Sequence, residues 1–185
     1  MKIFISGGCK NGKSSLAEKL SAQIRKPCTP VYYLATMIPA DSEDEARIIR
    51  HQRDREGCGF LTIEAGRDIL PSIDKCDSNG TFLLDSSTAL LANEMFTIGG
   101  KVEPDAYKKV AEDLIQLLSQ VNDVVIVSDY IYSDAILYDE LTESYRRGLA
   151  YIDKRMASAC DVVIEVCGGT QIIHKGELAM MQSAL

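Results

Sequence analysis

The residues with the clearest chemical use stand near the start of the chain. Residues 7–14 read Gly-Gly-Cys-Lys-Asn-Gly-Lys-Ser and fit the pattern G-x-x-x-x-G-K-[ST], the phosphate-binding P-loop. An apolar run at 2–6 precedes the loop, and a helical pattern begins at Ser15. A strand, a glycine-rich turn and a helix N-terminus aim backbone N–H groups at one point, where a polyphosphate can bind. This setting argues against the alternative, a chance match in a glycine-rich turn.

Several positions of the loop have an expected role. Gly7 and Gly12 allow close backbone approach and unusual dihedral angles. Lys13 is expected to reach the β- and γ-phosphates of a nucleotide, and Ser14 is expected to bind Mg²⁺ through its hydroxyl group. The sequence therefore predicts a nucleotide site that is built from a continuous run of residues, namely Gly7, Gly8, Cys9, Lys10, Asn11, Gly12, Lys13, Ser14 and Ser15.

Two aspartates stand at the ends of apolar strand-like runs. Asp85 follows the run at 81–84, and Asp129 follows the run at 124–128. Because ligands of open α/β sheets bind beyond the carboxyl ends of the strands, both acids are expected to face the site. An acid in such a place supports Mg²⁺ directly or through water, and we favour Asp85 for this role. The alternative for either residue is a solvated strand-end acid or a helix cap.

The helix expected at 42–56 combines a histidine with arginines. On a period of 3.6 residues, Arg47, Arg50, His51 and Arg55 share one face. The arginines discourage protonation of the imidazole, and a neutral imidazole can attack phosphorus while the arginines hold phosphate oxygens. Considered alone, however, this pattern favours a charged, solvated helix that contains an incidental histidine.

Composition and charge limit the class of protein. A length of 185 residues with 46% apolar and 25% charged residues is typical of one soluble globular domain. The formal charge of −7 argues against broad nucleic-acid binding, which needs a basic face. The chain runs directly into a strand, and no apolar run approaches the roughly 20 residues of a membrane span, so we expect a cytoplasmic protein. Six cysteines without C-x-x-C spacing and only two histidines argue against a zinc site.

Apolar strand-like runs alternate with helical segments along the chain. Strands are expected at 2–6, 31–36, 60–63, 81–85, 124–128 and 162–166, and the run at 171–174 suits an edge strand. Helices are expected from 15, at 42–56, briefly after 63, and at 87–97, 105–120 and 138–159. This order predicts an α/β fold, a three-layer P-loop NTPase (RecA-like) with a mainly parallel sheet covered by helices on both faces. We expect a single nucleotide-binding domain over 1–175 and a C-terminal tail over 176–185.

Beyond the P-loop, further segments carry a resemblance to a known family. They are 5–8, 33–36, 46–48 before His51, 83–85 followed by Thr88 and Asn93, 125–128 and 154–163. Together they resemble the bifunctional adenosylcobinamide kinase / adenosylcobinamide-phosphate guanylyltransferase family of cobalamin biosynthesis. The resemblance extends from Ile3 to about Gly168, which is nearly the whole chain.

The resemblance implies two group transfers with GTP or ATP and Mg²⁺. Family members phosphorylate the aminopropanol hydroxyl of adenosylcobinamide, and then transfer GMP to that phosphate from a covalently guanylylated histidine of the second helix. His51 matches that histidine by position, which reverses the interpretation of the helix considered alone. Members form trimers, so a homo-oligomer is expected. The expected site residues are then His51 and Lys13 for catalysis, Ser14 and Asp85 for the metal, and Arg47, Arg55 and Asp85 for nucleotide beside the P-loop.

The chain departs from the family's usual pattern in two segments. After the strand that ends at Ser128, members usually have Asn-Glu-Val-Gly, whereas this chain has the segment from Asp129 to Asp134. In the helix before Lys154, members usually have Gly-Arg-Val-Asn, whereas this chain has Ala150 to Asp153. The first segment lies at the end of a sheet strand, where a ligand should bind. Two other functions therefore stay open. One is a P-loop kinase for another small molecule, with His51 only a phosphate contact, and the other is a catalytically impaired nucleotide-binding regulatory paralogue.

Overall fold

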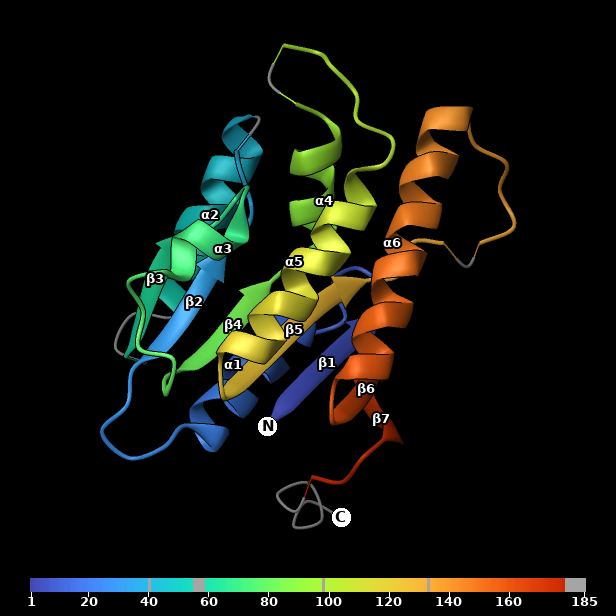
Figure 1. Ribbon diagram of the computed structural model, residues 1–185. Coiled ribbons are helices and arrows are strands. Elements are labelled where there is room, and N and C mark those ends of the chain that lie inside the picture. The colour runs from blue at the N-terminus through green and yellow to red at the C-terminus, as the bar shows by residue number, and fades with distance from the viewer. Residues whose placement is uncertain (40, 55–58, 98, 133, 179–185) are drawn as a thin grey trace.

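The computed structural model describes residues 1–39, 41–54, 59–97, 99–132 and 134–178. Within these ranges, seven strands form one sheet in the order β3-β2-β4-β5-β1-β6-β7 (Figure 1). The strands are β1 (Lys2–Gly7), β2 (Val31–Ala35), β3 (Phe60–Glu64), β4 (Thr81–Asp85), β5 (Asp123–Asp129), β6 (Val162–Cys167) and β7 (Thr170–Lys175). The strands from β1 to β6 run parallel, and β7 pairs antiparallel with β6 as the edge strand that the sequence predicts.

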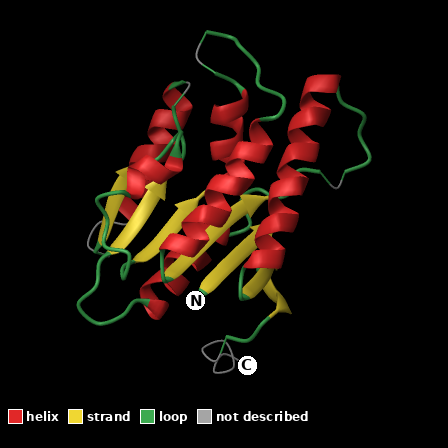
Figure 2. Cartoon of the chain, in the orientation of Figure 1, coloured by secondary structure: helices red, strands yellow, loops and turns green. Residues whose placement is uncertain are grey.

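Helices cover both faces of the sheet, as the alternating pattern predicts (Figure 2). They are α1 (Lys13–Ile24), α2 (Ser42–Asp54), α3 (Ile69–Ile73), α4 (Ser87–Met95), α5 (Ala106–Gln120) and α6 (Glu140–Ala159). Helix α1 packs on one face, and the core on the other face includes side chains of α3, α4, α5 and α6. No helix in the described part of the chain is both long and apolar enough to cross a membrane.

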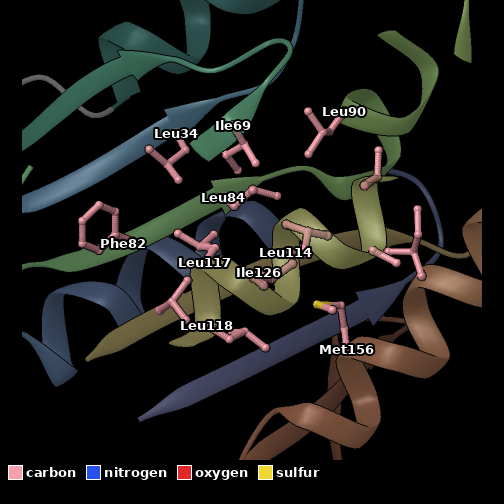
Figure 3. Packing of buried hydrophobic residues seen from close by; sticks show 14 of the residues in the cluster. Leu34, Ile69, Phe82, Leu84, Leu90, Leu114, Leu117, Leu118, Ile126 and Met156 are labelled. Carbon is pink, nitrogen blue, oxygen red and sulfur yellow. The ribbon is translucent and has the colours of Figure 1, made fainter. Parts of the chain in front are cut away.

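The central strands are buried on both faces, which explains their continuous apolar sequences. On the α5 side, Phe82 and Leu84 of β4 lie in one cluster with Leu114 and Leu117 of α5 (Figure 3). On the other side, Leu83 and its neighbours on β1 and β5 pack in the cluster that contains α1. Burying a side chain of this size contributes about 1.5–3 kcal/mol. The packing therefore holds the carboxyl ends of β1, β4 and β5 in fixed relative positions.

Two of the helix ends that differ from the prediction have a local cause. Helix α4 ends at Met95 rather than at 97, because Phe96 is extended and forms an isolated bridge with Val102. Helix α6 begins at Glu140 rather than at 138, because the Asp139 carboxylate accepts hydrogen bonds from the N–H groups of Leu141 and Thr142. Such a cap satisfies N–H groups that have no partner inside the helix.

The C-terminal strand is fastened to the end of α6 by Lys175. Its ammonium group donates to the carbonyl oxygens of Ala157, Ser158 and Cys160 at 3.2, 2.8 and 2.7 Å. Carbonyl groups at a helix C-terminus lack partners within the helix, and a cation is favoured there. Three residues further on, Leu178 is buried in the cluster on the α1 face. The rest of the expected tail, 179–185, lies outside the described residues.

Candidate active site

The predicted P-loop joins β1 to α1 in the expected geometry. Gly12 has a φ of 85°, in the left-handed region that favours glycine. A Cβ atom at Gly7 would lie 2.4 Å from the carbonyl oxygen of Val166, so only glycine fits there without a shift of β6. The first turn of α1 holds no acidic side chain and receives no side-chain cap. Its N–H groups are therefore available to an anion, which the positive end of the helix favours.

Neighbouring strands hold the loop in place. The side-chain amide of Asn11 donates to the carbonyl oxygen of Val166 on β6 at 3.2 Å. On the other side, the N–H group of Tyr130, just after β5, donates to the carbonyl oxygen of Gly7 at 3.2 Å. The loop is thus tied to both strands that flank β1, which keeps its backbone donors in place before any ligand arrives.

A cavity of about 530 Å³ opens beside the loop at the carboxyl edge of the sheet. P-loop residues 9–15 line one side, and Asp85 and Asp129 contribute from the ends of β4 and β5. Helix α2 contributes Glu43, Ile48 and Arg50. Ligand pockets typically enclose about 300–1,000 Å³, so the cavity has the size of a small-molecule site.

The Lys13 side chain lies almost fully buried at this cavity. Its ammonium group is 2.6 Å from Oδ1 of Asp129 and donates to the carbonyl oxygen of Gly8, also at 2.6 Å. Parallel pairing of β1 and β5 places Gly7 opposite Asp129, which brings the carboxylate to the start of the loop. Asp129, the less favoured candidate for the metal, is thus the ion-pair partner of the P-loop lysine.

Asp85 has a different partner. The Tyr33 hydroxyl donates to Oδ2 of Asp85 at 3.1 Å. Directly after it, Ser86 exchanges two hydrogen bonds with the Thr36 hydroxyl, at 2.6 Å from its N–H group and 2.9 Å to its carbonyl oxygen. The amide of Asn93 donates to the carbonyl oxygens of Thr36 and Gly66, at 2.7 and 2.8 Å. These bonds join the ends of β2 and β4 to α4 and fix the backbone that carries the Asp85 carboxylate.

The predicted residues therefore meet in part. The structure brings residues 9–15 of the P-loop and Asp85 to one cavity, with Gly7 and Gly8 at the base of the loop. Helix α2 contains positions 47 and 51, but the side chains of Arg47 and His51, and all of Arg55, lie outside the described residues. The sequence interpretation did not assign Tyr33 to the site. The sequence signal is its place two residues before the end of the strand, and the register of Tyr33 with Leu83 then puts its ring on the same face of the sheet as Asp85.

Comparison with known proteins identifies the family. The family model described as "Cobinamide kinase / cobinamide phosphate guanyltransferase" matches residues 3–173. The chain belongs to this family. Both activities in that description are group transfers, so the chain is a transferase, and the family resemblance that the sequence predicts is confirmed.

Relatives and solved structures agree with this family and with the fold. The chain is 29% identical to the bifunctional adenosylcobalamin biosynthesis protein CobU of Salmonella typhimurium, over 91% of this chain and 97% of that protein. It is similar in structure to the flagellar accessory protein FlaH from Methanocaldococcus jannaschii, with a TM-score of 0.52, 14% identity, and coverage of 95% of this chain and 78% of FlaH. A solved structure described as an ATPase domain gives a TM-score of 0.51 at 9% identity, over 94% of this chain and 76% of that domain. The fold is that of the P-loop NTPases, as predicted.

The two segments that depart from the family's usual pattern contact one another. The hydroxyl groups of Ser128 and Tyr132 donate to the Asp153 carboxylate at 2.7 and 2.9 Å. Asp153 is only 4% exposed, and burial raises the pKa of its carboxyl group to about 6. Nearby, Glu165 accepts a hydrogen bond from Tyr130 and pairs with His174, and the bond to His174 is the main reason that its pKa is lowered. Tyr130 and Tyr132, which follow β5, thus take part in half-buried polar contacts with α6 and β6.

The raised pKa of Asp153 predicts a stabilising substitution. The unfolded carboxyl group ionises near its ordinary pKa of 3.8, whereas the folded one retains its proton up to about 6. Stability is therefore lost as the pH rises between these values, and the loss stays at roughly 3 kcal/mol above them. Asp153→Asn should raise the free energy of unfolding by up to this amount at pH 7.5 and change it little at pH 4, as measured by urea titration. The exposed Asp74→Asn is the control. Equal effects of Asp153→Asn at both pH values would contradict the assignment.

Proposed function

We propose that this chain is a nucleoside-triphosphate-dependent adenosylcobinamide kinase and GTP:adenosylcobinamide-phosphate guanylyltransferase of cobalamin biosynthesis, acting through a covalent histidine–GMP intermediate. The observation that carries the proposal is one cavity that joins the P-loop, Asp85 and the helix that contains His51. Membership in the family supports the pair of activities. A homo-oligomer, a trimer by family resemblance, is part of the proposal.

In the kinase step, backbone N–H groups of the loop and of the first turn of α1 would bind the phosphates of ATP or GTP. Lys13 would neutralise the β- and γ-phosphates, and Ser14 with Asp85 would hold Mg²⁺. The donor set fits, because Mg²⁺ prefers oxygen ligands and is usually held by one or two carboxylates together with substrate phosphates. When bound, the ion neutralises charge on the transferred phosphoryl group.

In the second step, the neutral imidazole of His51 would attack the α-phosphorus of GTP. A P–N bond forms, the bond to the bridging oxygen breaks, and pyrophosphate leaves with the electron pair. An oxygen of the acceptor phosphate then attacks the same phosphorus, and the P–N bond breaks to restore the histidine. The described lining residues Glu43, Ile48 and Arg50 occupy a face of α2 on which a period of 3.6 residues also places positions 47 and 51. Arg47 and Arg55 would bind the phosphate oxygens.

Labelled GTP tests this proposal without a choice of acceptor. Protein incubated with Mg²⁺ and GTP that is labelled in its guanine ring should retain the label after denaturation, because the guanosine is transferred together with its α-phosphate. A P–N bond to imidazole is labile in acid and stable in base, which separates it from an ester. The absence of label, with phosphoryl transfer from ATP to a small molecule other than cobinamide, would favour the kinase alternative. Nucleotide binding without either transfer would favour the regulatory alternative.

Loss of the P-loop lysine should weaken nucleotide binding strongly. Lys13→Ala removes a charge-assisted contact to phosphate, and such contacts contribute about 1.5–3 kcal/mol, roughly 10- to 150-fold in affinity. The substitution also removes the cation of the ion pair with Asp129. Titration calorimetry with ATP and GTP measures the change. Lys10→Ala, which removes an exposed lysine of the same loop, is the matched control and should have the smaller effect. Unchanged binding in Lys13→Ala would remove the P-loop from the proposed site.

A further inference from the structure

The lysine that is expected to bind phosphate already has an anion beside it. The Lys13 side chain is 5% exposed and that of Asp129 is 27% exposed, so their ion pair is largely shielded from water. The N–H group of Asp129 donates to the Thr88 hydroxyl at 2.8 Å, which holds the end of β5 in place. Shielding strengthens an ion pair, because the local dielectric constant is lower than that of water. A phosphate that reaches Lys13 must therefore compete with a strong and well-positioned partner.

The described residues that line the cavity do not give it an excess of positive charge. The described charged residues that line it are three cations against four anions, namely Lys10, Lys13 and Arg50 against Glu43, Glu64, Asp85 and Asp129. A metal-free nucleoside triphosphate would bring about four more negative charges near neutral pH. Repulsion between the carboxylates and the phosphates is therefore large unless a cation offsets it.

We propose, on the basis of the proposed nucleotide site, that Asp129 is a counter-ion that the nucleotide must displace from Lys13. Asp129 thereby makes tight nucleotide binding depend on Mg²⁺. When phosphate takes over Lys13, the Asp129 carboxylate loses its partner next to a new anion. Bound Mg²⁺ lowers the charge of the nucleotide and so reduces this repulsion. The role belongs to Asp129 in particular, because the Asp85 carboxylate accepts a hydrogen bond from the Tyr33 hydroxyl and, among the described residues, has no ion pair like that of Asp129 with Lys13.

Calorimetry with Asp129→Asn tests this inference. The amide has nearly the same shape as the carboxylate, and the backbone bond to Thr88 can persist. Binding of ATP and GTP is measured with EDTA and with excess Mg²⁺. Asp129→Asn should tighten metal-free binding by about tenfold or more and Mg²⁺-bound binding by no more than about threefold, because the removed repulsion is greatest for the free polyphosphate. Asp129→Ala is the second variant, should the amide disturb the fold.

A double-mutant cycle with Lys13→Ala separates displacement from general repulsion. If Asp129 acts through Lys13, the gain from Asp129→Asn should be smaller in the Lys13→Ala background, where no ion pair has to be broken. Asp85→Asn is the control, and any effect of it on metal-free binding should be similar in both backgrounds. An equal gain from Asp129→Asn with and without Lys13 would overturn the inference, as would weaker metal-free binding in Asp129→Asn. If the wild-type protein binds no nucleotide under either condition, the nucleotide site itself fails, which is a separate and recognisable result.

Discussion

His51→Ala should abolish transfer of GMP to the protein while nucleotide binding stays intact. The imidazole is the proposed nucleophile, and alanine offers no group that can form the P–N bond. The P-loop is a separate segment of the chain, so the affinity for GTP should change little. Kinase activity should survive at least in part, because that step forms no bond to the histidine. Intact-protein mass spectrometry after incubation with GTP and Mg²⁺ measures the adduct directly.

The chain offers a matched control, since it contains only two histidines. The other one, His174, lies on β7 and pairs with Glu165 at 2.7 Å. It is not among the residues that line the cavity, so His174→Ala should still gain the mass of GMP. If His51→Ala gains that mass as readily as the wild type, or if the wild type never gains it, His51 is a surface residue of α2. The kinase alternative would then become the better explanation.

Asp85→Asn should remove Mg²⁺-dependent turnover and leave the fold intact. An amide lacks the negative charge that a carboxylate contributes to a magnesium site, and even outer-sphere partners of a metal are typically worth about 10- to 100-fold. We therefore expect a loss of about 100-fold or more in phosphoryl transfer for this proposed direct ligand. Rates measured over a range of Mg²⁺ concentrations, with circular dichroism to verify the fold, test the expectation.

Asp129→Asn is the informative partner of this experiment. The Asp129 carboxylate forms an ion pair with Lys13 and is not the proposed metal ligand. Asp129→Asn should therefore still require Mg²⁺ for turnover. The reverse result, with Asp129→Asn losing metal dependence and Asp85→Asn retaining it, would exchange the roles of the two acids.

Much of the fold is predictable because its signals are local. Runs such as 82–84 and 124–127 are apolar throughout, as is typical of strands buried on both faces. The order of the strands is a different matter. That β5 lies between β1 and β4 depends on packing between segments that are far apart in sequence, and no local pattern encodes it.

The residues of the site also divide into those that a local motif reveals and those that only tertiary packing brings together. The P-loop is a contiguous motif, so its residues could be named from the sequence, and strand ends pointed to Asp85 and Asp129. The pairing of Asp129 with Lys13 joins residues 116 positions apart, and it follows from the register of β5 with β1. The buried carboxylate of Asp153 was equally hidden, because a helix such as α6 carries many charged residues and only tertiary packing selects the one that is buried.

The fastening of β7 to α6 by Lys175 has a practical consequence for anyone who shortens this protein. A fragment that stops before residue 175 would return the carbonyl oxygens of Ala157, Ser158 and Cys160 to water and free an edge strand that carries Ile172 and Ile173. A fragment that stops at 175 would still lose Leu178, which is buried in the cluster on the α1 face, at a cost of about 1.5–3 kcal/mol. The cluster that contains the buried side chains of α1 would then lack one of its members. The shortest fragment suited to crystallisation or binding studies therefore runs through Leu178.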